Sequence, residues 1–180
     1  GLPIPDIVHI PQPYWYGDDA GLSPEELGIR AARALEAKIE ELGPDNVAAF
    51  IAEPVQGAGG VIIAPGTYWP EVRRVLEKYD ILLVMDEVIC GFGRTGKWFG
   101  NIFYGMKPDL MTFAKAVTNG YQPLGGVMVG ERVAAVLTTR GGEFAHGFTY
   151  SGHPAACAAG LATLKILREE RVVENVESVT

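Results

Sequence analysis

The feature that most constrains the fold is an unbroken apolar run at residues 81–85, which ends on two acids, Asp86 and Glu87. A short apolar run between turn residues is typical of a strand covered on both faces, as in the parallel sheets of α/β proteins. The two acids then lie near the carboxyl end of that strand. Because ligands bind at this edge of open α/β sheets, the run predicts an α/β fold with a ligand site directly after it.

A second apolar stretch, residues 110–126, carries one cation, Lys115, between two alanines. Burial disfavours the charged form of a lysine and lowers its pKa, which produces a nucleophilic amine. A buried amine and a buried acid, each at the end of an apolar run, suit pyridoxal phosphate. The amine forms a Schiff base, and the carboxylate keeps the pyridine nitrogen protonated. Alternatively, Lys115 is a solvated strand end and the acids belong to a loop or a helix cap; spacing alone leaves both interpretations open.

Four motifs, taken together, identify a family. They are EPVQGAGGV at 53–61, DEVICGFGRTG at 86–96, TFAKAVTNGYQPLGG at 112–126 and HGFTYSGHP at 146–154. In this order and spacing, the motifs resemble the class III pyridoxal-phosphate-dependent aminotransferases. The likeness is strongest to omega-amine, or polyamine, to pyruvate aminotransferases, and it covers nearly all 180 residues.

The resemblance implies the large domain of the fold-type-I transferases, an α/β fold with a mainly parallel sheet flanked by helices. Residues 1–153 would form the back half of this cofactor-binding domain. Residues 154–180 would form a connecting helix towards a C-terminal small domain that is absent. Members of the family are more than twice as long as this chain, so we expect an internal fragment. It would lack the phosphate cup, the aromatic that stacks on the cofactor and the arginine that binds a substrate carboxylate.

The resemblance also assigns roles to individual residues. Lys115 would be the catalytic residue, holding pyridoxal phosphate as a Schiff base and acting as general base. Asp86 would bind the ring nitrogen of the cofactor, and Val88 would pack on the face of the ring. Glu53 would lie near the wall of the active site.

The 146–154 motif implies a dimer. In the family this loop reaches across the subunit interface, where Thr149 and the backbone of Phe148 meet the phosphate of the neighbouring subunit's cofactor. A hydroxyl and backbone N–H groups are suitable donors for a phosphate. We therefore expect a homodimer or a dimer of dimers. His146 and His153 are expected to brace the loop rather than to act as bases.

Two departures from common family patterns bear on the substrates. Many members that use 2-oxoglutarate have a glutamate at the position of Ala58, and many of the 4-aminobutyrate type have a glutamine at Ile89. The resemblance thus implies ping-pong transfer of an amino group from a primary amine or omega-amino donor, such as a diamine, to a 2-oxo acid, with pyruvate favoured. A pyridoxal-phosphate-dependent aminomutase, racemase or decarboxylase stays open, as does a non-enzymatic structural fragment.

Composition excludes several other classes. The net charge of −7 disfavours non-specific binding to nucleic acid or to anionic membranes. No apolar run approaches the length of about 20 residues that a membrane-spanning helix needs. Cys90 and Cys157 fit neither a zinc site nor a disulfide framework, and no signal-peptide pattern is present. We therefore expect a cytoplasmic protein with reduced thiols and no metal.

Two glycine-rich segments invite other interpretations. Residues 91–96 fit the dinucleotide signature G-x-G-x-x-G, but the sequence that follows contains further glycines and a proline and does not open a helix. Residues 56–60 could cradle a phosphate, although a tight turn with a close backbone approach is the favoured interpretation.

Periodicity and capping signals predict the remaining elements. Ser23, Pro24 and Glu26 form a capping box that starts a helix, which Gly43-Pro44 ends. Further helices are predicted at 67–79, 131–138 and 155–173, strands at 47–52 and 127–129, and an extended proline-rich segment at 1–22. The strand, helix, strand order between 47 and 85 predicts a parallel crossover unit.

Overall fold

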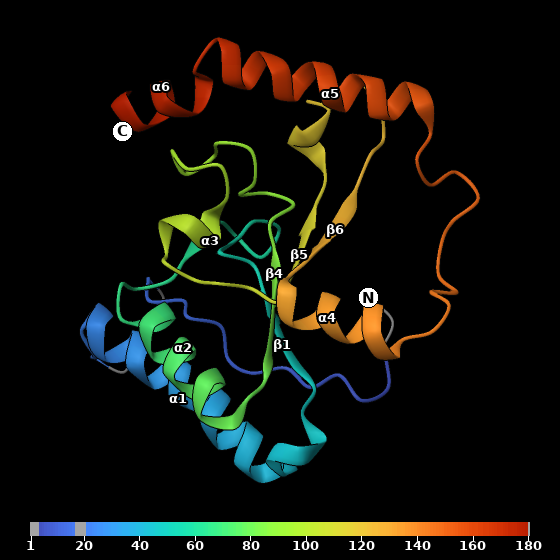
Figure 1. The fold of residues 1–180 in the computed structure, drawn as a ribbon. Helices are drawn as coiled ribbons and strands as arrows, with labels where there is room; N and C mark the ends of the chain where they lie inside the picture. The colour runs from blue at the N-terminus through green and yellow to red at the C-terminus, as the bar shows by residue number, and fades with distance from the viewer. Residues whose placement is uncertain (1–3, 17–20, 180) are drawn as a thin grey trace. The chain divides into compact units, whose positions relative to one another are not determined.

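The computed structural model describes residues 4–16 and 21–179 (Figure 1). These residues form two compact units. The first unit contains the described parts of Gly1–Ala48 together with Ile62–Ile81. The second contains Ala49–Val61 and the described part of Leu82–Thr180. Of the predicted extended segment 1–22, residues 4–16, 21 and 22 contain no helix, and residues 1–3 and 17–20 lie outside the described residues.

The first unit is built on two helices, α1 (Pro24–Leu42) and α2 (Tyr68–Tyr79), which pack against each other. It also contains the 3-10 turn η1 (Pro44–Asn46) and the short strand β3 (Ile62–Ile63). The predicted capping box is confirmed, because the Ser23 hydroxyl accepts from the Glu26 N–H and the Glu26 carboxylate accepts from the Ser23 N–H. Apolar side chains at helical spacing fill the interface, among them Leu35 and Ile39 from α1 and Val72 and Val75 from α2.

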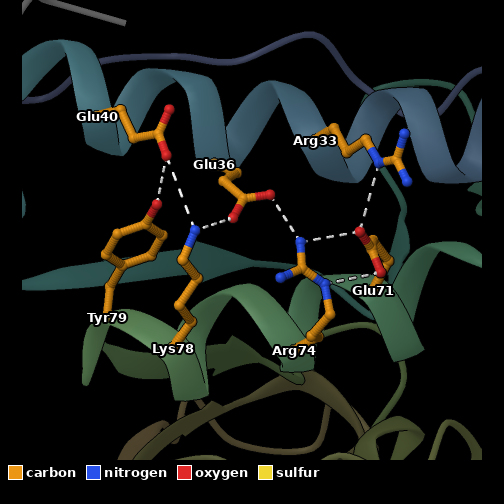
Figure 2. A network of polar contacts seen from close by, with 7 residues as sticks. All are labelled: Arg33, Glu36, Glu40, Glu71, Arg74, Lys78 and Tyr79. Atoms are coloured by element: carbon orange, nitrogen blue, oxygen red, sulfur yellow. Dashed lines mark hydrogen bonds and ion pairs between the residues drawn. The ribbon is translucent and has the colours of Figure 1, made fainter.

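A network of charged and polar side chains links α1 to α2 (Figure 2). Its centre is Glu36, whose two carboxylate oxygens lie 2.6 Å from Arg74 Nη2 and 2.7 Å from Lys78 Nζ. Arg74 also binds Glu71 at 3.0 Å, and the Tyr79 hydroxyl donates to another α1 carboxylate at 2.6 Å. Arg74 and Lys78 are therefore each shared between two acids, so the network ties the two helices together at several points.

The second unit contains a four-stranded sheet in the order β1-β4-β5-β6 (Figure 1). The strands are β1 (Ala49–Ala52), β4 (Leu82–Asp86), β5 (Leu110–Phe113) and β6 (Gly126–Val129). β1, β4 and β5 run parallel, whereas β6 pairs antiparallel with β5. The prediction of a mainly parallel sheet, with 47–52 and 81–85 as parallel neighbours, is confirmed.

The remaining elements of this unit follow the sheet strands. They are β2 (Val55–Gln56), α3 (Gly100–Phe103), the 3-10 turn η2 (Lys115–Val117), α4 (Glu131–Arg140), α5 (Pro154–Glu169) and α6 (Val172–Val179). None of the helices within the described ranges is both long and apolar enough to cross a membrane.

The prediction of one continuous helix at 155–173 is wrong. The helical backbone stops at Glu169, and α6 starts again at Val172. Arg171 has a φ of 51°, a left-handed conformation that interrupts the ladder of helical hydrogen bonds. The expected connecting helix at 154–180 is therefore two helices separated by a turn, with residue 180 outside the described residues.

The two faces of the sheet differ in how well they are covered. Leu83, Met85 and Met111 are buried on one face. On the other face, the Ile51 side chain is 61% exposed and Val127 is 56% exposed. A parallel sheet normally has both faces covered, so this apolar face is unusual for its class.

The charge network predicts a pH-dependent contribution to stability. Hydrogen bonds from Lys78 and then from Arg74 lower the pKa of Glu36 below its ordinary value of 4.5. A carboxylate with a lowered folded-state pKa stabilises the fold at higher pH, and this contribution is lost as the pH falls through the folded-state pKa. Glu36→Gln should therefore lower the melting temperature of the full-length protein at pH 7, by an amount that shrinks below about pH 4.5.

Glu77→Gln is a matched control, since it removes the same charge from an exposed position on α2. Melting curves from pH 4 to pH 8 for both variants should separate loss of the Glu36 network from loss of a surface charge alone. A gap between Glu36→Gln and the wild type that is equal at all these pH values would contradict the assignment.

Candidate active site

The ends of β4 and β5 bring the two central candidate residues to the same edge of the sheet. Asp86 is the last residue of β4 and is paired in register with Thr112 of β5. Lys115 opens the η2 turn shortly after β5 ends. Because the two strands are parallel neighbours, Asp86 and Lys115 both lie at the carboxyl edge, where ligand sites of α/β sheets form.

Lys115 is exposed, so the prediction of a buried amine is wrong for this chain. It borders an open hollow of about 620 Å³, which Thr118, Gln122 and Leu124 also line. The flanking alanines do not bury it, because the strand has already ended and the backbone turns with a φ of 48° at Lys115. A left-handed residue other than glycine costs about 1 kcal/mol or more, and such strain is often found at functional sites.

The turn that carries Lys115 is supported from one side by α5. Gly160 of α5 faces the turn, and a Cβ there would lie 3.7 Å from the carbonyl oxygen of Val117, an ordinary packing distance. Val117 and Thr118 are themselves buried, and the Thr118 hydroxyl donates to the Gln122 carbonyl at 2.5 Å. Lys115 therefore lines the hollow from a turn that buried neighbours hold in place.

Asp86 is half-buried, and one of its oxygens, Oδ1, accepts the N–H of Val88 at 3.1 Å. The expected contact of Val88 with a cofactor ring is not tested, but Val88 is half-buried beside Asp86. Close by in register, the Thr112 hydroxyl is buried and has no hydrogen-bond partner among the described residues. Within the described part of the chain, the edge thus presents a carboxylate oxygen and a hydroxyl that have no hydrogen-bond partner.

The fully buried acid in this region is Glu87, which sequence reasoning did not single out. Its carboxylate accepts the backbone N–H groups of Gly100, at 2.8 Å, and Asn101, at 2.6 Å. Burial raises the pKa of Glu87, and the two N–H donors oppose that rise. Strand alternation could have found it, because Glu87 continues the inward-facing series of Leu83 and Met85.

Glu53 closes the glycine-rich turn at 56–60, and the prediction of a tight turn is confirmed. Glu53 Oε2 accepts the Gly57 N–H at 2.8 Å, and the Gly57 carbonyl accepts the N–H groups of Gly60 and Val61. A Cβ on Gly57 would lie 2.8 Å from Ile89 Cδ1. Glu53 therefore stabilises the turn from within and uses the Gly57 N–H, while Gly57 packs against Ile89 in the segment that follows Asp86.

The dinucleotide signature at 91–96 forms a loop and does not open a long helix. Phe92 N–H donates to the Trp98 carbonyl at 2.6 Å, and Gly96 N–H donates to the Gly93 carbonyl at 3.1 Å. The next helix, α3, has four residues and starts only at Gly100. A Rossmann turn needs a helix N-terminus at the glycines, so the structure disfavours a dinucleotide site here.

The 144–153 segment forms an exposed loop between α4 and α5 (Figure 1). The Phe148 side chain is 78% exposed, and its N–H donates to Ser151 Oγ at 3.1 Å. The His146 ring contacts the rings of Phe144 and Phe148 edge-on, as expected for a residue that braces the loop. Thr149 is exposed, and nothing within the described parts of the chain places it near Lys115.

Comparison with known proteins gives consistent results. A family model described as aminotransferase class-III matches residues 2–180. A putrescine–pyruvate aminotransferase of Pseudomonas aeruginosa is 61% identical over 179 residues, 99% of this chain and 39% of that protein.

Two solved structures agree in fold. An (S)-enantioselective omega-transaminase from Thermomicrobium roseum matches with a TM-score of 0.92 and 52% identity, over 97% of this chain and 39% of its own. An omega-transaminase from Pseudomonas jessenii, solved in complex with PMP, matches with a TM-score of 0.88 and 46% identity. This match covers 96% of this chain and 39% of that protein's chain. The predicted fold type I is confirmed. The chain spans about two fifths of the length of these proteins.

The contact between Gly57 and Ile89 generates a prediction. Gly57→Ala should destabilise the full-length protein by about 1–3 kcal/mol, because the added methyl group overlaps the Ile89 side chain. Truncation of that side chain in the double variant Gly57→Ala/Ile89→Ala should recover part of the loss, seen as a coupling energy of about 1 kcal/mol in urea unfolding. Strictly additive effects of the two substitutions would contradict the contact.

Proposed function

Because the chain belongs to the class-III aminotransferases, we propose that the protein catalyses pyridoxal-phosphate-dependent transamination. The observation that carries the proposal is the shared edge of β4 and β5, which brings a carboxylate, Asp86, and a primary amine, Lys115, to one end of the sheet. The family depends on pyridoxal phosphate, and the P. jessenii relative was solved with PMP. Both support the cofactor.

The residues at the edge fit this cofactor. Asp86 has one oxygen bound to Val88 N–H and another that has no partner among the described residues, which suits a protonated ring nitrogen. The side-chain amine of Lys115 makes no hydrogen bond or ion pair within the described residues, and Lys115 borders an open hollow. The buried, unsatisfied hydroxyl of Thr112 is a further sign that the edge lacks a polar partner.

When bound, pyridoxal phosphate supplies an electron sink that stabilises the charge left after a proton leaves the substrate carbon. Lys115 would hold the cofactor covalently and later move that proton through Nζ, as a general base and then a general acid. Asp86 would keep the ring nitrogen protonated, Val88 would pack on the ring, and Glu53 would hold the glycine turn near the site wall.

We propose a primary amine or omega-amino compound, such as a diamine, as donor and pyruvate as acceptor. The P. aeruginosa relative is a putrescine–pyruvate aminotransferase, which supports both assignments. Ala58, an exposed residue in the glycine turn, brings no carboxylate of the kind that many 2-oxoglutarate-using members have there. An aminomutase, racemase or decarboxylase would use the same Lys115 and Asp86. These reactions need no 2-oxo acid, so dependence of turnover on added pyruvate separates them.

We further propose a homodimer or a dimer of dimers, in which Thr149 and the Phe148 backbone meet the partner's cofactor phosphate. The exposed aromatic rings of the 144–153 loop support an interface there, since Phe144 is 69% and Tyr150 is 81% exposed.

A cytoplasmic location is also part of the proposal. It rests on two unpaired cysteines, Cys90 and Cys157. Burial raises the pKa of Cys90 to about 11, so this thiol stays protonated and unreactive.

The Schiff-base role of Lys115 is tested by borohydride reduction of the full-length protein with pyridoxal phosphate, followed by peptide mass mapping. A pyridoxyl adduct is expected on Lys115 and nowhere else. Lys115→Ala should lose the adduct and turnover while it keeps its unfolding transition. Lys107→Ala, which removes another exposed lysine of the same unit, is the control and should retain both. Turnover at the wild-type rate in Lys115→Ala would sink the assignment.

The contribution of Thr149 to the partner's site is tested with mixed dimers. Thr149→Val removes one donor to a phosphate and should weaken cofactor binding about tenfold. A mixed dimer of Lys115→Ala and Thr149→Val subunits has one site with an intact Lys115. If the loop serves the partner, that site receives an intact Thr149 and binds cofactor with wild-type affinity. Weakened binding at that site would mean that the loop acts within its own subunit.

A further inference from the structure

Glu87 is a buried acid that the proposed chemistry does not use. Among the described residues it is the one carboxylate with no exposed surface. A buried charge is costly unless hydrogen bonds replace its hydration. The hydrogen bonds that stabilise the buried Glu87 carboxylate show which segment of the chain it holds in place.

Both carboxylate oxygens of Glu87 are bound to backbone N–H groups on the far side of a loop. Oε2 accepts from Gly100 at 2.8 Å, and Oε1 accepts from Asn101 at 2.6 Å. Gly100 is packed so tightly that a Cβ there would lie 2.7 Å from Pro54 Cβ and 3.0 Å from Cys90 Cβ. The backbone N–H groups that bind the carboxylate are therefore closely packed against neighbouring residues.

The backbone of Glu87 fixes the near side of the same loop. Its N–H donates to the Thr112 carbonyl of β5 at 3.0 Å, and its carbonyl accepts the Gly91 N–H at 2.7 Å. A Cβ on Gly91 would lie 2.8 Å from that carbonyl oxygen, so the turn leaves no room for a side chain. Glu87 thus closes the 88–99 loop. Its backbone carbonyl binds the start of the loop at Gly91, and its side chain binds Gly100 and Asn101, directly after the loop.

The first peptide of this loop determines how Asp86 is directed. Asp86 Oδ1 accepts the Val88 N–H at 3.1 Å, which leaves the other oxygen for a ligand. The position of the Val88 N–H depends on the conformation of the loop that Glu87 closes. A loosened loop would therefore rotate the Asp86 carboxylate away from its ligand direction.

We propose that Glu87 is a positioning residue for Asp86, which sets the direction of the Asp86 carboxylate towards the ring nitrogen of the cofactor by closing the 88–99 loop. The inference rests on the proposed function, because it assumes that Asp86 meets the cofactor. Glu87 itself touches neither cofactor nor substrate in this assignment.

The test compares three variants of the full-length protein with the wild type. Glu87→Gln keeps the shape of the side chain but places an NH2 group against a backbone N–H, so one donor loses its acceptor. Gly100→Ala leaves Glu87 intact and displaces its partners. Val72→Ala, at a fully buried position of α2, is the control for stability loss alone. For each, the dissociation constant of pyridoxal phosphate, the pH midpoint of the bound cofactor's visible absorbance and the melting temperature of the cofactor-free protein are measured.

Glu87→Gln and Gly100→Ala should both weaken cofactor binding by about tenfold, which corresponds to about 1.4 kcal/mol. Both should also shift the pH midpoint of the visible band. Val72→Ala should lower the melting temperature and leave the dissociation constant and the midpoint at wild-type values. If Glu87→Gln does not fold, Glu87→Asp and Gly100→Ala carry the test, with the same expected shift.

Wild-type affinity and an unshifted midpoint in the Glu87 and Gly100 variants would overturn the inference and reduce Glu87 to a structural residue. A wild-type protein that binds no pyridoxal phosphate would overturn the proposed function, and the inference with it. The two failures are distinguishable, because only the second is seen without any substitution.

Discussion

Parallel pairing of β4 with β5 is the constraint on which the candidate site depends. The register sets Asp86 opposite Thr112, and the chain then needs only a short turn to present Lys115 at the same edge. The 87–109 segment separates the two strands in sequence. Without the pairing of the strands, the position of Asp86 therefore says nothing about that of Lys115. This explains how a carboxylate and an amine 29 residues apart come to the same edge of the sheet.

Features that depend on local sequence were predicted well. The capping box at Ser23, the apolar strand before Asp86 and the parallel neighbours at 47–52 and 81–85 follow from side-chain periodicity and from the needs of helix ends. The failures concern features that depend on distant contacts. Lys115 is flanked by alanines and yet exposed, because burial depends on what packs over the turn and not on its immediate neighbours.

Two further differences have other origins. Arg171 interrupts an otherwise helical pattern through a left-handed backbone that no propensity indicates. Glu87 was read together with Asp86 as one acidic pair, although alternation along the strand places the two side chains on opposite faces. Asp86 is half-buried at the carboxyl edge of the sheet and Glu87 is fully buried, so two adjacent acids lie in different environments.

The uncovered face of the sheet has a consequence for the behaviour of these residues in solution. Ile51 and Val127 present aliphatic surface to water, and among the described strands β6 lies at an edge of the sheet, where the side chains of Met128 and Val129 are also exposed. An apolar edge of this kind is a template for pairing with another chain. A polypeptide limited to these 180 residues is therefore expected to aggregate through β6 during expression, and a charged substitution at Val127 would act as a gatekeeper against it.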